Sequence, residues 1–209
     1  MTPGGHRWGR GGGPVLDPVV LRPECATLVP PDMGYAASYS AARAEGYSDG
    51  LSAAAGAAGT GGDPADPAEH IAGLNGRGGT MRLPGGRRVE RVPHAHLWMV
   101  AGGEFIGRVG VRYALNARLR RWGGHIGYEV RPLYRGRGFG HRALALGIAH
   151  AGGKGLRELL LTCDDENAAS AAIIERAGGM LADVGPHPMQ PGRRSRRYWI
   201  KTEADTPGT

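Results

Sequence analysis

A run of glycines and arginines, placed between a strand-like and a helix-like segment, most constrains the fold of this chain. The run reads Arg135-Gly136-Arg137-Gly138-Phe139-Gly140-His141, after the strand-like residues 125–130 and before the helix-like residues 142–148. Glycines let the backbone approach an anion closely, and the unpaired N–H groups of a helix's first turn point at that anion. The flanking arginines add positive charge that a bound phosphate would offset, so the pattern predicts a phosphate-binding loop.

Three other kinds of glycine-rich loop fit the sequence less well. The dinucleotide-binding fingerprint expects a buried strand directly before the loop and an acidic residue about 20 residues later, whereas residues 132–134 separate strand from loop here. The nucleotide-binding P-loop needs a Gly-Lys-Ser/Thr sequence, which is absent. Disordered Arg-Gly repeats that bind RNA lack a following apolar helical period, but Leu144, Ile148 and Ala151 stand at helical spacing. We therefore expect the loop to lie in a folded domain.

Two motifs follow each other in this order. The first is Val130-x-Pro132-x-x-Arg135-Gly136-x-Gly138-x-Gly140, and a helix and the strand-like residues 158–163 come after it. The second is the segment 167–179, which begins Asn167-Ala168-Ala169-Ser170 and ends in Gly178-Gly179. Together they resemble the GNAT superfamily of N-acetyltransferases, densely over residues 95–202 and faintly before them. The resemblance implies an α/β fold (an α+β mixed sheet), with a central, mostly antiparallel sheet, a parallel pair splayed around the cofactor, and flanking helices.

The chain is long enough for one domain with short extensions. Residues 1–18 are rich in Gly and Pro, which predicts a disordered N-terminal extension. We assign residues 19–203 to a single acetyltransferase domain, with its cofactor-binding half at about 95–203, and residues 204–209 to a disordered tail. The patterns predict strands at 19–28, 97–101, 104–112, 123–130, 158–163, 179–183 and 197–201, and helices at 32–47, from 66, from 142 and from 167. Asp32 is the expected N-cap of the first helix, and Gly102-Gly103 the turn of a hairpin.

The charge balance allows three interpretations. The 209 residues include 26 basic and 19 acidic side chains, which gives a formal net charge of +7 and a pI of about 9.9. A positive net charge is typical of proteins that bind nucleic acid and of proteins that bind an anionic cofactor such as coenzyme A. It can also arise from a composition in which arginine replaces lysine on the surface. The small number of lysines, Lys154 and Lys201 only, favours this last interpretation. Charge alone does not choose among them.

The cysteines and the apolar segments argue against a disulfide-rich, metal-binding, membrane-spanning or secreted protein. Cys25 and Cys163 provide neither a disulfide framework nor metal-ligand spacing, so no metal is expected. No apolar run reaches the length of a membrane span, and the first residues lack the apolar region of a signal peptide, so we expect a cytoplasmic protein. Asp164 and Asp165 would raise the pKa of the Cys163 thiol, which favours an inert thiol over an acyl-cysteine.

The resemblance implies that acetyl-CoA is the co-substrate and that the loop holds its pyrophosphate. The loop residues carried over are Arg135, Gly136, Arg137, Gly138, Gly140 and His141. Val130 stands where the family's strand splays, and its backbone would bind the pantetheine arm and polarise the thioester carbonyl. Asn167 matches an asparagine that bonds the pantetheine in the family, but an N-cap of the following helix is an equal alternative. Ser170 is ambiguous in the same way.

The general acid is where the sequence departs from the family. Many members place a tyrosine seven residues after the asparagine, and Ile174 stands there instead. A thiol of pKa about 8.5 leaves readily, so an acid is helpful but not required. For the base, Glu129 is our first candidate and His125 the second, since both lie on one face of a strand and an alkylamine must lose a proton to attack. A surface carboxylate paired with an arginine remains the alternative for Glu129.

We therefore expect an N-acetyltransferase that moves an acetyl group from acetyl-CoA to a primary amine by direct transfer in a ternary complex. The acceptor is expected to be a small molecule or a peptide. One alternative is a GNAT-fold protein that binds coenzyme A without catalysis, which Ile174 makes conceivable. Another is a basic nucleic-acid-binding module, for which residues 196–199 (Arg-Arg-Tyr-Trp) are the only hint. Neither nucleic acid nor a membrane is an expected partner, and a homodimer is left open.

Overall fold

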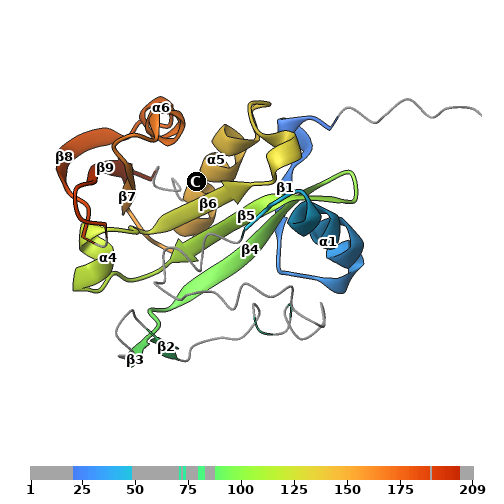
Figure 1. The fold of residues 1–209 in the computed structure, drawn as a ribbon, viewed down its shortest axis with the longest axis horizontal. Helices are drawn as coiled ribbons and strands as arrows, with labels where there is room; N and C mark the ends of the chain where they lie inside the picture. Colours follow the sequence, from blue (N-terminus) through green and yellow to red (C-terminus); the bar gives the residue numbers. More distant parts are fainter. Residues whose placement is uncertain are drawn as a thin grey trace, which may run out of the picture.

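A four-stranded antiparallel sheet in the order β1-β4-β5-β6 forms the centre of the fold (Figure 1). Its strands are β1 (Thr27–Val29), β4 (His94–Ala101), β5 (Glu104–Arg112) and β6 (Ile126–Val130). The computed structural model describes residues 21–48, 71, 73, 80–82, 88–188 and 190–202. The expected α/β architecture is confirmed within them.

A second sheet has three antiparallel strands in the order β7-β9-β8. They are β7 (Glu158–Asp164), β8 (Met180–Pro186) and β9 (Arg194–Lys201), and a separate pair consists of β2 (Thr80–Arg82) and β3 (Arg88–Glu90). The α-helices whose bounds lie within the described residues are α1 (Ala36–Ala44), α4 (Ala117–Arg121), α5 (Phe139–Gly153) and α6 (Ala168–Arg176). The described part of the chain also contains the short 3-10 helices η1 (Pro23–Cys25), η2 (Met33–Tyr35) and η3 (Pro132–Tyr134).

Local signals explain the elements that the sequence predicts. Gly102 and Gly103 have φ angles of 56° and 81°, which are the left-handed values that a tight β4–β5 hairpin turn requires. The Asp32 carboxylate accepts a hydrogen bond from the Gly34 N–H at 2.7 Å, so the expected cap is confirmed. The segment after it divides into η2 and α1.

Several predicted boundaries were wrong. The strand expected at 19–28 is, within the described residues, only β1, because Pro23 begins the helix η1 instead. The helix α4 was missed, since its arginine-rich sequence has no apolar period and only the Asn116 cap marks it. Strands β8 and β9 are longer than predicted. The predicted extensions 1–18 and 204–209 and the helix start at 66 lie outside the described residues.

The two faces of the central sheet bury different clusters. One face packs against α5, where a Cβ on Gly147 would lie 3.1 Å from both Val109 and Ile126. Such a close helix–sheet approach requires glycine at that position. On the other face, aromatic side chains of α1 and the hairpin pack together, with the Tyr39 and Trp98 rings stacked at 4.9 Å.

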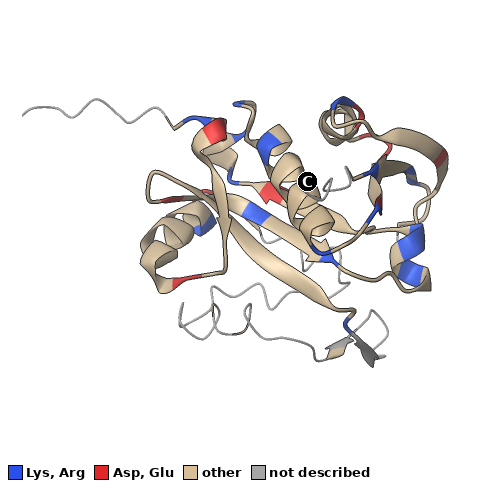
Figure 2. Cartoon of the chain, turned by 180° about the vertical axis from the view of Figure 1, so that it is seen from behind, with Lys and Arg blue, Asp and Glu red and all other residues tan. Residues whose placement is uncertain are grey.

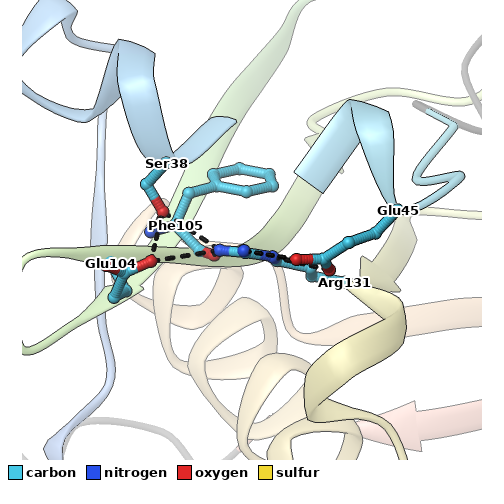
Figure 3. A network of polar contacts seen from close by, with 5 residues as sticks. All are labelled: Ser38, Glu45, Glu104, Phe105 and Arg131. Atoms are coloured by element: carbon cyan, nitrogen blue, oxygen red, sulfur yellow. Dashed lines mark hydrogen bonds and ion pairs between the residues drawn. The ribbon is translucent and has the colours of Figure 1, made fainter. Parts of the chain in front are cut away.

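A buried arginine ties the end of β6 to the rest of the domain (Figure 3). Arg131 donates to Glu45 Oε1 at 2.6 Å and to Glu45 Oε2 at 2.9 Å, in a bidentate pair. Its Nη1 also donates to Ser38 Oγ and to Glu104 Oε2, both at 3.1 Å. Arg131 directly follows Val130, the last residue of β6. The network therefore holds α1 and the β4–β5 hairpin against the end of β6.

Candidate functional site

Strands β6 and β7 meet at one end and then separate. The His125 N–H donates to the Leu160 carbonyl at 2.7 Å, and the Leu160 N–H donates to His125 Nδ1 at 2.8 Å. A Cβ on Gly124 would lie 2.3 Å from the Leu160 carbonyl oxygen, so only glycine allows this approach. Beyond the contact the two strands belong to different sheets and line one cavity in the same chain direction. They form the splayed parallel pair that the sequence predicts.

A cavity of about 380 Å³ occupies this gap. Residues from β4, β5, β6 and β7 and from the start of α6 line it, among them Arg108, Tyr128, Glu129, Cys163, Asn167 and Ser170. Side chains from both faces of the central sheet therefore line it, because alternate residues of β6 point to opposite faces.

The backbone of β6 presents its polar groups to the gap at alternate residues. Arg131 N–H donates to the Ile106 carbonyl, and Arg112 N–H to the His125 carbonyl, each at 2.8 Å. The odd-numbered residues of β6 therefore bond to β5, and the backbone groups of Tyr128 and Val130 face away from it. The Val130 carbonyl accepts a hydrogen bond from Arg135 Nε at 2.9 Å. The contact of the Val130 backbone with the pantetheine arm stays a prediction.

The loop after η3 has the geometry of an anion cradle. Gly136 and Gly138 have φ angles of 70° and 86°, values that other residues adopt only with strain. Gly138 is the N-cap of α5, and the first bond of that helix runs from Arg142 N–H to the Gly138 carbonyl at 3.2 Å. The three preceding N–H groups, of residues 139–141, therefore have no partner within the helix. Such amides at an exposed helix start fit the diphosphate of coenzyme A.

Other residues of the loop have structural contacts as well. A Cβ on Gly140 would lie 2.8 Å from Ile173 Cδ1, so this glycine also lets α5 approach α6. Arg142 donates twice to the Ala26 carbonyl, at 2.8 and 3.1 Å, and so fastens η1 to α5. The Arg137 guanidinium lies 5.8 Å from the centre of the Tyr134 ring.

Basic side chains also gather away from the loop. In the view from behind, several arginines lie on the short helix α4 (Figure 2).

Asn167 caps α6. Its Oδ1 accepts a hydrogen bond from the Ser170 N–H at 3.0 Å, which is the capping alternative that the sequence left open. Both residues line the cavity. The cap explains why asparagine stands here, and the pantetheine contact of Asn167 and Ser170 stays a prediction.

Tyr128 is a site residue that the sequence interpretation missed. Its ring lies on the α5 face of β6, 4.0 Å from where a Cβ would stand on Gly140. Desolvation raises the pKa of its buried hydroxyl, and the nearby Ser170 side chain lowers it by a smaller amount. The family pattern points to a tyrosine in α6 instead, but the residue there, Ile174, is buried in the core. The alternation of β6 was the available signal, because Tyr128 shares a face with Val130.

Glu129 lies on the opposite face of β6 from Tyr128. It stands directly across from Arg108 of β5 in the strand register. Its Oε1 lies 3.3 Å from Arg135 Nη2, so the arginine-paired carboxylate that the sequence analysis considered is present. This pair links the acid of the cavity to the glycine-rich loop.

His125 is placed beside the point where the strands meet. Its Nδ1 accepts the Leu160 N–H, so that nitrogen carries no proton. Desolvation lowers the pKa of the imidazole, and the charges of Arg120 and Arg112 lower it further. These contacts account for His125 as a residue that joins β6 to β7.

The surroundings of Cys163 keep its thiol protonated, and the acidic residues after it are paired with arginines. Burial raises the pKa of the Cys163 thiol to about 11, so it stays protonated at neutral pH. The acidic run beyond it pairs with arginines near β9: Arg196 Nε lies 2.7 Å from Asp165 Oδ1, and Arg193 Nη2 lies 3.1 Å from Glu166 Oε2. An inert thiol and a neutralised acidic run follow from these contacts.

Two further features bear on ligands. Within the part of the chain that the structure describes, no group of three or more His, Cys, Asp or Glu side chains is placed to hold a metal ion. No described helix combines the length and the apolar character that crossing a membrane requires.

Comparison with known proteins identifies a family. Residues 58–180, more than half of the chain, match the family described as Acetyltransferase (GNAT) domain. No curated protein matches the chain by sequence.

Solved structures show the same fold. RimJ of Mycobacterium smegmatis, in complex with CoA-disulfide, is 22% identical with a TM-score of 0.59, over 90% of this chain and 88% of that one. The microcin C7 self-immunity acetyltransferase MccE, in complex with acetyl-CoA and AMP, is 16% identical with a TM-score of 0.56, over 84% and 92%. A probable acetyltransferase is matched over only 62% of its length, with a TM-score of 0.43. At these identities the likeness is one of fold.

Proposed function

The chain belongs to the acetyltransferase (GNAT) family, and we propose on this basis that it transfers an acetyl group from acetyl-CoA to a primary amine, directly and within a ternary complex. The observation that carries the proposal is the cavity between β6 and β7. Glu129 lines this cavity, and so does Tyr128, whose ring lies beside Gly140 at the glycine-rich start of α5. This arrangement offers a place for a long anionic thioester and for an amine beside it.

The loop supplies the groups that would hold the co-substrate. The amides and side chains of Arg135, Gly136, Arg137, Gly138, Gly140 and His141 surround the start of α5 and face the diphosphate in this proposal. The backbone of Val130, with Asn167 and Ser170, borders the path of the pantetheine arm. Bound acetyl-CoA supplies a thioester that is already activated towards attack, so positioning provides much of the rate.

The two proposed proton transfers, from the amine and to the departing sulfur, use side chains on opposite faces of β6. On the face away from α5, Glu129 Oε accepts the proton of the attacking amine, with His125 as the second candidate. On the α5 face, the Tyr128 hydroxyl donates a proton towards the departing sulfur. Its raised pKa keeps the phenol protonated at neutral pH. Tyr128 would thereby fill the role that Ile174 cannot.

The acceptor is proposed to be the primary amine of a small molecule or a peptide. The nucleic-acid alternative finds no support in residues 196–199. Arg196 bonds to Asp165, Arg197 bonds to Asp183, and the Tyr198 ring is fully buried. These contacts use the basic side chains within the protein.

Two measurements test the proposal together. Acetyl-CoA should raise the melting temperature more than NAD or ATP at equal concentration, because a ligand that binds only the folded state stabilises it. Release of free thiol should then be followed with acetyl-CoA and a panel of amines and N-terminal peptides, with mass spectrometry of the acetylated product. Equal shifts with NAD or ATP would contradict the co-substrate. A clear acetyl-CoA shift without thiol release from any amine would favour the non-catalytic alternative.

A further inference from the structure

A buried arginine lines the cavity without a hydrogen-bonded partner on its Nε. Arg108 of β5 is 6% exposed, and its Nε bonds to nothing among the described residues. A buried cation is unfavourable unless an anion or an acceptor pairs with it. A guanidinium placed in this way at the wall of a cavity is suited to bind an anionic ligand.

The surrounding backbone leaves room for such a ligand. Arg108 Nη1 lies 3.8 Å from where a Cβ would stand on Gly110, so the guanidinium extends over this glycine. Gly110 pairs with Gly127 on the neighbouring strand, and a Cβ on Gly127 would meet nothing within 4 Å. Two glycines side by side thus form an open floor next to the arginine.

The charges around this floor favour an anion. Arg112 lies on the same face, and its Nη1 donates to the carbonyls of Gly123 and Gly124 at 3.0 and 3.1 Å. Burial, together with the neighbouring charges of Arg108 and Arg118, lowers the pKa of Arg112 to about 10. A nearby negative charge would relieve this repulsion between cations.

The carboxylates that line the cavity are already paired with other arginines. Glu129 lies 3.3 Å from Arg135, and Asp164 lies 3.2 Å from Arg193. No ion pair joins either carboxylate to Arg108 among the described residues. His94, opposite Arg112, adds a ring whose Nδ1 lies 2.9 Å from the Val92 carbonyl oxygen.

We propose that Arg108 binds the anionic group of the acceptor, so that the preferred acceptors are small amines that also carry a carboxylate or a phosphate. This inference rests on the proposed acetyl transfer, because it places the acceptor on the Glu129 face. Arg108 and Glu129 are direct cross-strand neighbours, with Cβ atoms about 5 Å apart. One small molecule can therefore present its anion to the arginine and its amine to the carboxylate. A peptide N-terminus with neutral side chains lacks the anion.

Matched pairs of amines test the preference. The carboxylate arm compares amino acids with their amides, and the phosphate arm compares 2-aminoethyl phosphate with ethanolamine. We expect the anionic member of at least one pair to have a kcat/KM higher by about tenfold or more, mainly through KM, since a charge-assisted contact adds affinity. Arg108→Gln should remove this preference, whereas Arg121→Gln, which removes the same charge from exposed α4, should keep it.

A binding measurement makes the test independent of turnover. The same anionic amines should raise the melting temperature of the wild-type protein but not that of Arg108→Gln, whose shift with acetyl-CoA should be retained. The subsite is overturned if neutral amines serve as well in every pair, or if Arg108→Gln keeps the preference. It is also overturned if no anionic amine stabilises the protein. Failure of acetyl transfer itself would show differently, as no thiol release with any amine.

Discussion

The guanidinium of Arg135 contacts both the Val130 carbonyl and the Glu129 carboxylate. Its Nε donates to Val130 O at 2.9 Å, and its Nη2 lies 3.3 Å from Glu129 Oε1. One side chain of the glycine-rich loop therefore reaches the candidate base and the last backbone carbonyl of β6. We therefore expect occupation of the loop and orientation of the carboxylate to be coupled through this contact.

This coupling predicts that Arg135→Lys lowers kcat about tenfold, because an ammonium cannot make both contacts in the fixed geometry of a guanidinium. The melting temperature should hardly change, since the Arg135 side chain is 55% exposed and such pairs add little stability. Arg121→Lys is the control, because it makes the same exchange on the exposed helix α4, and it should keep kcat. Steady-state kinetics with acetyl-CoA and a responsive amine decide the matter, and equal kcat values for both variants would contradict the coupling.

The cradle predicts a different effect for Gly138→Asp, which should abolish the shift in melting temperature with acetyl-CoA. The new carboxylate adds negative charge and bulk where the diphosphate approaches the backbone. The control is Gly155→Asp, because Gly155 has nearly the same φ, 85° against 86°, at the far end of α5. Both variants lose about 1 kcal/mol of stability to backbone strain. Only Gly138→Asp should lose binding, and undiminished acetyl-CoA affinity in that variant would exclude the loop as the cradle.

The Arg131 network predicts a stability that depends on pH. The hydrogen bond from Arg131 holds the pKa of Glu45 below its ordinary value of 4.5. A depressed carboxyl pKa contributes stability above the unfolded-state value and loses it as pH falls through the folded value. Arg131→Met should cost about 2 kcal/mol at neutral pH, since both partner carboxylates are partly exposed.

The measurement is chemical denaturation of wild type and Arg131→Met from pH 7 to pH 3. Their difference in unfolding free energy should be constant above pH 5 or so and shrink as the pH falls below 4.5, the ordinary pKa of the Glu45 carboxyl. A difference that does not change with pH would show that packing, and not the ion pair, accounts for the stability.

The sequence predicts those parts of the site that depend on local geometry. Gly136 and Gly138 were identifiable because left-handed backbone and a helix start leave a short-range signature. Val130 followed from the motif, and the hydrogen bonds between β5 and β6 show that its backbone groups face away from β5. The N-cap of Asn167 was one of two alternatives. The hydrogen bond from the Ser170 N–H shows the cap, and the pantetheine contact stays a prediction.

Long-range contacts could not be predicted in the same way. Arg131 pairs with Glu45, 86 residues away, and nothing near either residue marks the pair. Arg108 stands in a strand whose arginines suggest a solvated face, and its burial becomes visible only when β4, β5 and β6 are assembled. Tyr128 was overlooked because the family pattern directs attention to α6.

Tyr128→Phe tests the proposed proton donor. The variant keeps the ring and its packing, so acetyl-CoA affinity should be unchanged while kcat falls about tenfold at neutral pH, a modest loss for a general acid. The loss should shrink above the thiol pKa of about 8.5, where the thiolate leaves without a proton. Rates at pH 7 and pH 9.5 provide the comparison. A loss of equal size at both pH values would assign Tyr128 to packing.

The proposed base predicts the behaviour of Glu129→Gln. With a responsive acceptor, kcat/KM should fall by roughly 10²-fold at neutral pH, the low end for the loss of a positioned base. The loss should become smaller as pH rises towards the amine's own pKa of about 10, because more acceptor then arrives deprotonated. Acetyl-CoA affinity should stay nearly the same, since only the backbone of Val130 is asked to hold the pantetheine.

His125→Asn is the companion variant, because it removes the second candidate base. His125 joins β6 to β7, so this variant should lower the melting temperature and affect the rate with little dependence on pH. If Glu129→Gln retains near-normal rates at every pH, its carboxylate serves only to hold Arg135, and a pH-dependent loss in His125→Asn would transfer the role. If Glu129→Gln also loses acetyl-CoA binding, the Arg135 contact has been disturbed, and Arg135→Lys should then show the same loss of affinity.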